Sequence, residues 1–486
     1  MEKIVDYIRE AIESFLDRNS APESIGWQDS VQNEVGFLKD MEALETFLTP
    51  INMLGAAKLV KPDFISTDGL TKAIATTFSR TIDFIETKGF PPSPYLDKEL
   101  LKVGIDYSTT KINFSDSVSF FITLFADIWE FSGNSRSQAI RELRIILEEK
   151  IKYLKEAIDW IIDNAREYPV TKGNSKKVYW EWGEIKGPVP LPSLYSTYSV
   201  SVALDSLLET SELKREIADR YGEELVNTLV ELLRGAYEWT RSIVVSQKTE
   251  EGKDLYYVEY PNVDRTEKIP SRGLLVYTLL TFMSAEPFLK KGELDIDLIT
   301  KIIDTLMYSY TNEKEETFLQ TSNAHIINIA SVDPIMYEDR TLLYCLLEGL
   351  SWANKTLSDN RGKVVTDEEF LKKMSYVIDS TLRDIMIRQH PENHLWNEES
   401  FKIYYTQRSL EALTYYAVYV SDELKSKLNL IPLSMETNLR AAVQEAVRKV
   451  TEQISNMLIT EILSNTGKLM NPVSEKEDVV KLKTER

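Results

Sequence analysis

The sequence predicts a mainly all-α protein made of about six helical hairpins, with an inner layer of helices wrapped by an outer layer. Segments that are apolar on every face alternate along the chain with segments that carry one apolar stripe and are otherwise charged. A helix that is apolar all round must be enclosed by other elements, whereas a striped helix covers a core from outside. Glycine and proline are scarce, at 18 and 17 of 486 residues, which excludes collagen-like and low-complexity classes.

The inner helices are expected to begin at six sites with related sequences. The first two sites share Asp-Ser-Val, and the last three share an arginine that recurs at intervals of 68 residues. A signal that repeats at a nearly constant period is typical of an architecture built from like units. The expected starting points are Asp29, Asp116, Tyr198, Arg272, Arg340 and Arg408.

Outer helices are expected after each of the first five inner ones, followed by a long return loop. The strongest runs from about Ser137 to Asn164, where apolar residues recur every three and four positions and glutamate, lysine and arginine fill the rest. That spacing places one apolar stripe on a helix whose other faces meet water. After Pro432 a last amphipathic helix is expected, followed by a charged tail.

This order of helices resembles the α/α toroid, the ring of hairpins found in six-hairpin glycosidases, terpenoid cyclases, protein prenyltransferases and lanthionine cyclases. The resemblance implies a ring over 26–422. Outside it, the sequence predicts an N-terminal helix at 1–25, a long C-terminal helix at 423–467 and a charged, mobile tail at 468–486. It also implies an active site at the mouth of the ring, where the return loops enter the inner helices. A helical solenoid is the alternative, because one period cannot show that the ring closes.

The return loops are rich in aromatic and β-branched residues, which predicts short strands among the helices. Sugar rings stack on aromatic faces, and glycoside hydrolysis needs two carboxyl groups beside one bond. The aromatic candidates for ligand binding are Trp180, Trp182, Tyr257 and Trp396. The candidate catalytic carboxyl groups are Glu181, Glu259, Asp264 and Asp339. The alternative is that the aromatic rings close the loops onto the core and that water solvates the acids.

Arg272, Arg340 and Arg408 are expected in the first turns of inner helices. The start of a helix carries free N–H groups and partial positive charge, so an added guanidinium group favours binding of an anion. The three arginines therefore predict a phosphate, carboxylate or sulfate site at the ring mouth. The alternative is that each arginine pairs with an acid such as Asp264 or Asp339 and only orders its loop.

Composition excludes several classes of function. The chain has 57 basic and 77 acidic residues, for a net charge of −20, so it lacks the basic surface that binding of bulk nucleic acid requires. One cysteine, Cys345, permits no internal disulfide, and three histidines offer few soft ligands, so neither a metal nor a cofactor is expected. No signal peptide or membrane span is evident, which favours a cytoplasmic protein without a membrane partner.

Two hypotheses of function remain. The first is a binding scaffold that holds a protein partner or an anionic small molecule, with the anion at the ring mouth. The second is an intracellular toroid enzyme that acts on a glycan through paired carboxyl groups in acid–base catalysis. A deep pocket with two facing carboxyl groups would favour the enzyme, whereas a plugged ring with an exposed apolar patch would favour the scaffold.

Overall fold

The structure is a computed structural model that describes part of the chain. The described residues are 2–19, 37–61, 67–90, 115–133, 138–168, 177–182, 191–248, 252–261, 268–312, 341–359, 368–389, 396 and 402–420. All of them belong to one compact unit, Met1–Leu428. The C-terminal helix expected within 423–467 and the tail expected over 468–486 lie outside the described residues.

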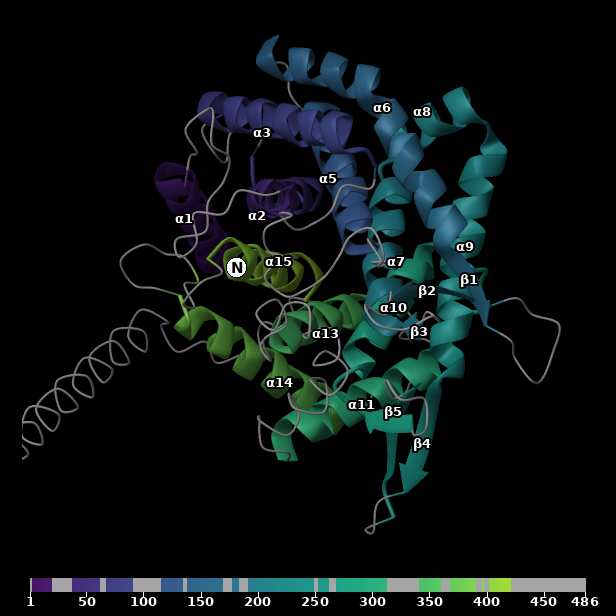
Figure 1. Cartoon of the computed structure of the whole chain (residues 1–486). Coiled ribbons are helices and arrows are strands. Elements are labelled where there is room, and N and C mark those ends of the chain that lie inside the picture. The colour runs from purple at the N-terminus through teal and green to yellow at the C-terminus, as the bar shows by residue number, and fades with distance from the viewer. Residues whose placement is uncertain are drawn as a thin grey trace, which may run out of the picture. The chain divides into compact units, whose positions relative to one another are not determined.

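Six inner helices form a closed ring in the described part of the chain. They are α2 (Phe37–Ala56), α5 (Ser115–Gly133), α7 (Leu194–Glu209), α10 (Leu275–Ala285), α13 (Thr341–Asp359) and α15 (Lys402–Tyr419). Each packs against the next in sequence, and α15 packs against α2 (Figure 1). Because the first and last units of a solenoid stay apart, this contact identifies the fold as the α/α toroid that the sequence predicts.

Outer helices pack against that ring from outside in the described part of the chain. The outer helices among the described residues are α1 (Glu2–Asn19), α3 (Thr67–Lys88), α6 (Gln138–Asn164), α9 (Glu223–Ser242), α11 (Ile296–Asn312) and α14 (Glu368–Ile387). Two further helical segments lie in connections. Helix α8 (Ser211–Tyr221) lies between α7 and α9, and the 3-10 helix η1 (Glu286–Phe288) lies between α10 and α11. Helix α1 packs on both α2 and α15. The N-terminal helix therefore covers the seam at which the ring closes.

Burial distinguishes the two layers as the hydrophobic pattern predicts. Every residue of α10 is buried, because other elements surround this short apolar helix on all faces. In α6 the stripe that includes Ile140, Leu147 and Ile151 is buried, while Glu142 and Glu149 on the same helix are exposed. Each fully buried leucine or isoleucine contributes about 1.5–3 kcal/mol to stability relative to an exposed one. The core therefore lies between the layers and around the inner ring.

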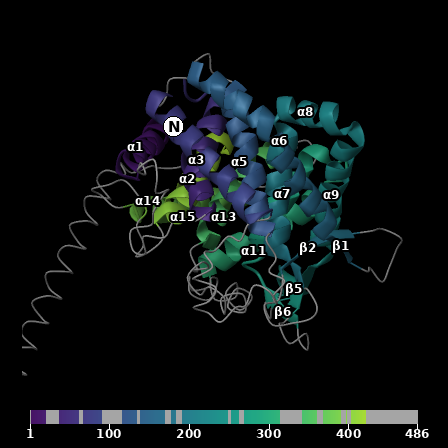
Figure 2. The same ribbon diagram turned by 45° about the horizontal axis from the view of Figure 1, so that its top comes forward.

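Short strands occupy two of the connections from outer to inner helices, as expected. The first sheet consists of β1 (Ala165–Tyr168), β2 (Lys177–Trp182) and β3 (Leu191–Ser193), in that antiparallel order. The second consists of β4 (Val244–Lys248), β5 (Asp254–Pro261) and β6 (Lys268–Ser271), also antiparallel. Figure 2 shows labelled strands of both sheets gathered at one end of α7 and α9. The sheets thus lie at the end of the ring where α7 and α10 begin.

None of the helices in the described ranges combines the length and apolarity that crossing a bilayer requires.

Candidate functional site

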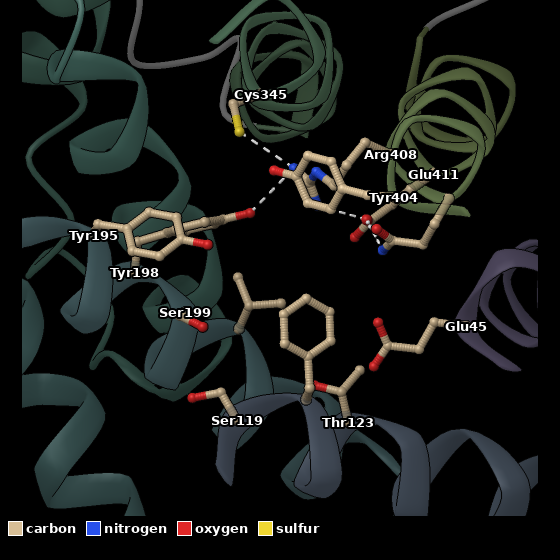
Figure 3. Close-up of a pocket in the computed structure, with 13 residues that line it drawn as sticks. Glu45, Ser119, Thr123, Tyr195, Tyr198, Ser199, Cys345, Tyr404, Arg408 and Glu411 are labelled. Carbon is tan, nitrogen blue, oxygen red and sulfur yellow. Dashed lines mark hydrogen bonds and ion pairs between the residues drawn. The ribbon is translucent and has the colours of Figure 1, made fainter. Parts of the chain in front are cut away.

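A small cavity of about 50 Å³, partly open to solvent, lies among five of the six inner helices (Figure 3). Its lining residues are Glu45 of α2, Ser119, Phe120 and Thr123 of α5, Tyr195, Tyr198, Ser199 and Val202 of α7, Cys345 of α13, and Tyr404, Gln407, Arg408 and Glu411 of α15. Ser119, Tyr198 and Cys345 are each the fifth residue of their helix. These helices therefore point the same way, and the cavity lies toward their N-terminal ends, where the strands also lie.

Arg408 is the centre of a buried hydrogen-bonding network beside the cavity. Its Nη2 donates to Oε2 of Glu348 at 2.9 Å, to Sγ of Cys345 at 3.2 Å and to Oη of Tyr198 at 3.4 Å. Its Nη1 donates to Oε2 of Glu411 at 2.5 Å. The side chain of Arg408 is only 8% exposed, and that of Glu348 is 2% exposed. One buried guanidinium group thus holds two carboxyl groups and joins helices α7, α13 and α15.

Burial changes the protonation of the groups around Arg408. It raises the pKa of Glu348 to about 8, although the charge of Arg408 opposes the shift. It also raises the pKa of the Cys345 thiol to about 12, so the thiol stays protonated at neutral pH and is a poor nucleophile. Cys345 therefore contributes a weak acceptor to the network and no covalent chemistry.

Glu45 has a different environment from Glu411. Its side chain is buried, its Oε1 has no hydrogen-bond partner, and Figure 3 shows the carboxyl group pointing into the cavity. Burial and the negative charges of Glu411 and Asp127 raise the pKa of Glu45 well above its usual range. Oε2 of Glu411, by contrast, also accepts a hydrogen bond from Nε2 of Gln407 at 3.0 Å. The cavity therefore holds one carboxyl group with an unpartnered oxygen and a raised pKa, and one carboxyl group fixed by two donors.

Three polar atoms of the lining are buried without a partner: Oε1 of Glu45, Oγ of Ser119 and Oε1 of Gln407. A buried polar atom that makes no hydrogen bond costs about 1–3 kcal/mol, so folded proteins rarely retain several in one place.

Aromatic rings form one wall of the cavity. Tyr198 stacks on Tyr277 of α10 with ring centroids 5.2 Å apart and planes at 28°, and Tyr195 meets the same ring edge-on at 5.4 Å. Tyr404 contributes a further ring from α15. Flat apolar faces beside hydroxyl and carboxyl groups suit a ligand that is apolar on its faces and polar at its edges.

The structure places Trp180 and Trp396, two predicted ligand-binding residues, in the core. Both side chains are almost fully buried. The indole N–H of Trp180 donates to the carbonyl oxygen of Ile161 at 3.1 Å, and that of Trp396 donates to the carbonyl oxygen of Ile385 at 2.6 Å. Each backbone N–H also donates at 3.3 Å to a threonine hydroxyl of the following inner helix. In each case the indole N–H binds the preceding outer helix and the backbone N–H binds the following inner helix, so the tryptophan links both helices.

The remaining loop candidates lie on the strands or outside the described residues. Glu181 and Trp182 end strand β2, and Glu259 pairs with Pro270 between β5 and β6. Tyr257 is half-buried on β5, opposite Val245 of β4. The candidates Asp264, Asp339 and Arg340 lie outside the described residues.

Arg272 and Arg408, the two repeated arginines that the structure describes, do not occupy equivalent positions. Arg272 lies in the turn before α10, because the strand Lys268–Ser271 continues almost to the helix. Arg408, expected in the first turn, is the seventh residue of α15, because the helix already begins at Lys402. Of the two, Arg408 lines the cavity. Tyr404 and Tyr405 belong to the same helix.

The carboxyl groups that surround the cavity were not predicted from the sequence. Glu45, Glu348 and Glu411 lie in inner helices, whereas the predicted catalytic acids lie in the loops. A signal was available, because each is an acid in an apolar helix that must be enclosed. A buried charge requires a partner, so such residues mark a polar site within a core.

Within the described ranges, no group of three or more histidine, cysteine, aspartate and glutamate side chains is arranged to hold a metal ion.

The chain matches no family model, and it matches no curated protein. Among solved structures it is similar to the cellobiose 2-epimerase of Spirochaeta thermophila DSM 6192. The two sequences are 12% identical, the TM-score is 0.40, and the match covers 85% of this chain and 97% of the epimerase chain. The similarity is too weak to carry function across, so the function must be inferred from the cavity.

Proposed function

We propose that the protein is an enzyme that binds a saccharide in the ring cavity and acts on it by acid–base catalysis with Glu45 and Glu411. The supporting observation is that two carboxyl groups from neighbouring inner helices line one cavity in unlike environments. Pairs of acids whose surroundings separate their protonation states are the usual basis for dividing the roles of acid and base.

The environments suggest which residue plays which role. Glu45 keeps its proton at neutral pH, because burial and nearby carboxyl groups raise its pKa, so it can give that proton to an oxygen of the substrate. Glu411 accepts hydrogen bonds from Arg408 and Gln407, which orient it to take a proton from the substrate or from water. A positioned acid or base of this kind contributes about 10²–10⁴-fold to a rate.

A saccharide fits the lining better than an anion does. Its hydroxyl groups can pair with the hydroxyl, amide and carboxyl groups that line the cavity, and its ring faces can contact the tyrosines. An anion would have to displace Glu348 or Glu411 from Arg408, which would leave a buried carboxyl group without its partner. The cavity therefore favours the enzyme over an anion-binding scaffold.

The test incubates the full-length protein with a panel of neutral mono- and disaccharides in D₂O and follows the mixtures by NMR. We expect either a new reducing end, which reports hydrolysis, or exchange of a carbon-bound proton for deuterium, which reports proton transfer. Glu45→Gln and Glu411→Gln should each lower the rate at least about 100-fold.

Asp205→Asn is the matched control. Asp205 is a buried acid of α7 whose Oδ1 has no partner, but it does not line the cavity. Its replacement should leave the rate unchanged. The proposal is wrong if no saccharide reacts, or if the glutamine variants and the control retain equal activity.

A further inference from the structure

Two carboxyl groups share Arg408, and only one of them lines the cavity. Glu348 of α13 and Glu411 of α15 contact different nitrogens of the same guanidinium group, at 2.9 and 2.5 Å. Glu411 borders the cavity, whereas Glu348 lies behind Arg408 and is almost completely buried. A planar guanidinium group offers two such edges at once, which a lysine cannot do.

We infer that Arg408 and Glu348 are positioning residues for the proposed catalytic pair: Arg408 fixes Glu411 at the cavity, and Glu348 fixes Arg408 from behind. This inference rests on the proposed function, because it assigns roles relative to Glu411. Neither residue needs to touch the reacting atoms.

The charge balance explains why Glu348 must stay neutral for this arrangement to work. The titratable groups that face Arg408 are Glu348 and Cys345 of α13, Tyr198 of α7 and Glu411 of α15, and Glu45 of α2 lies near Glu411. Burial keeps Glu348, Cys345 and Tyr198 protonated at neutral pH. The single positive charge of Arg408 is then available to Glu411.

Raising the pH should disturb this balance. Because burial raises the pKa of Glu348 to about 8, this residue ionises in mildly alkaline solution, before the thiol of Cys345 does. Ionised Glu348 competes with Glu411 for the same guanidinium group and places a second negative charge beside the cavity. The rate should therefore fall as the pH rises through about 8.

Two variants of the full-length protein test these roles. Arg408→Lys keeps the charge but cannot bridge both carboxyl groups, so kcat should fall roughly ten- to hundredfold with little change in KM. Glu348→Gln can still accept the hydrogen bond from Nη2 but cannot ionise. It should lower kcat at pH 7 less than Arg408→Lys does, and it should lose the part of the alkaline decline that lies near pH 8.

Asp205→Asn again serves as the control, because it removes the ionisable group of a buried acid. Asp205 lies two turns after Tyr198 on α7, about 10 Å along the helix axis. It should change neither kcat nor the pH profile. If Arg408→Lys and Glu348→Gln lower only the melting temperature and leave kcat, KM and the pH profile as in the wild type, both residues are merely structural and the inference is wrong.

A measurement that needs no substrate separates this inference from the proposed function. In protein labelled with ¹³C at the glutamate carboxyl carbons, the signal of Glu411 is identified by its absence in Glu411→Gln. Both Arg408→Lys and Glu348→Gln should shift that signal, whereas Asp205→Asn should not. Shifts without any saccharide turnover would refute the proposed function and keep the network, and an unshifted signal in both variants would refute the network itself.

Discussion

The inner helices α13 and α15 have two unlike ends. Toward their beginnings they contribute Cys345, Glu348, Arg408 and Glu411 to a polar network beside an open cavity. Toward their ends the contacts between them are aromatic. Trp352 of α13 packs against Tyr415 at 5.5 Å and stacks on Tyr419 at 5.8 Å with planes at 9°.

The difference teaches how one pair of helices combines stability with a reactive interior. The aromatic end buries large rings in direct contact, an arrangement that stabilises the fold and offers no space for a ligand. The polar end leaves buried acids and unpartnered atoms around a cavity, an arrangement that lowers stability but suits binding. We therefore expect changes at the two ends to separate stability from activity.

The largest effect should come from the aromatic end. Trp352→Ala removes a ring that is 7% exposed and should lower the free energy of unfolding by about 3–5 kcal/mol. Urea unfolding measures that loss. Saccharide turnover per folded molecule should stay near the wild-type value, and a matching collapse of turnover would show that the two ends are not independent.

A smaller effect should appear as a dependence of stability on pH. Burial raises the pKa of Asp127 in α5 from 3.8 to about 7, although hydrogen bonds from Thr49 and Asn52 oppose the shift. Between about pH 4 and 7 the folded protein therefore keeps a proton that the unfolded chain has released. The contribution of Asp127 to stability must then decrease as the pH rises through that range, by at most about 1.4 kcal/mol per unit.

The measurement for Asp127 is urea unfolding at several pH values. Asp127→Asn cannot titrate, so its free energy of unfolding should fall less steeply between pH 4 and 7 than that of the wild type. Trp352→Ala should be destabilised at every pH but keep the wild-type slope. Equal slopes in wild type and Asp127→Asn would contradict the assignment.

The smallest effect should be a gain in stability at the polar end. Glu45→Met replaces a buried carboxyl group that has an unpartnered oxygen with an apolar side chain of similar length. We expect the free energy of unfolding to rise by about 1 kcal/mol at pH 7, while saccharide turnover is lost. Thermal unfolding and the NMR assay check the two halves of this expectation, and a clear loss of stability would mean that Glu45 has a structural role.

The layered ring was predictable because its cause is local. A segment such as Leu275–Ala285, apolar at nearly every position, must lie inside, and the striped segment Gln138–Asn164 must lie outside. Closure was not predictable, because the contact of α2 with α15 joins segments that lie at opposite ends of the ring sequence. The role of α1 at the seam was missed for the same reason.

The site was less predictable than the fold. Arg408 stood out because it repeats a signal, and Glu411 follows it at i+3 on the same helix. Its other partner, Glu348, is brought to it by packing between α13 and α15, which leaves no spacing to detect. The loop tryptophans were conspicuous for their size, yet Trp180 and Trp396 face the core, because an indole N–H can reach a carbonyl at the end of a helix. Aromatic composition alone did not distinguish an anchor from a binding surface.

Closure of the ring by its first and last inner helices also bears on how the chain folds during synthesis. Helix α2 buries Met41, Leu44 and Phe47, and its neighbour α15 begins at Lys402. At about 5–20 residues per second, a ribosome needs on the order of tens of seconds to make the intervening chain. During that interval α2 lacks its partner and exposes apolar surface on the nascent polypeptide. The α2 edge of the incomplete arc is therefore where we expect chaperones to bind, and where chains released too early should aggregate.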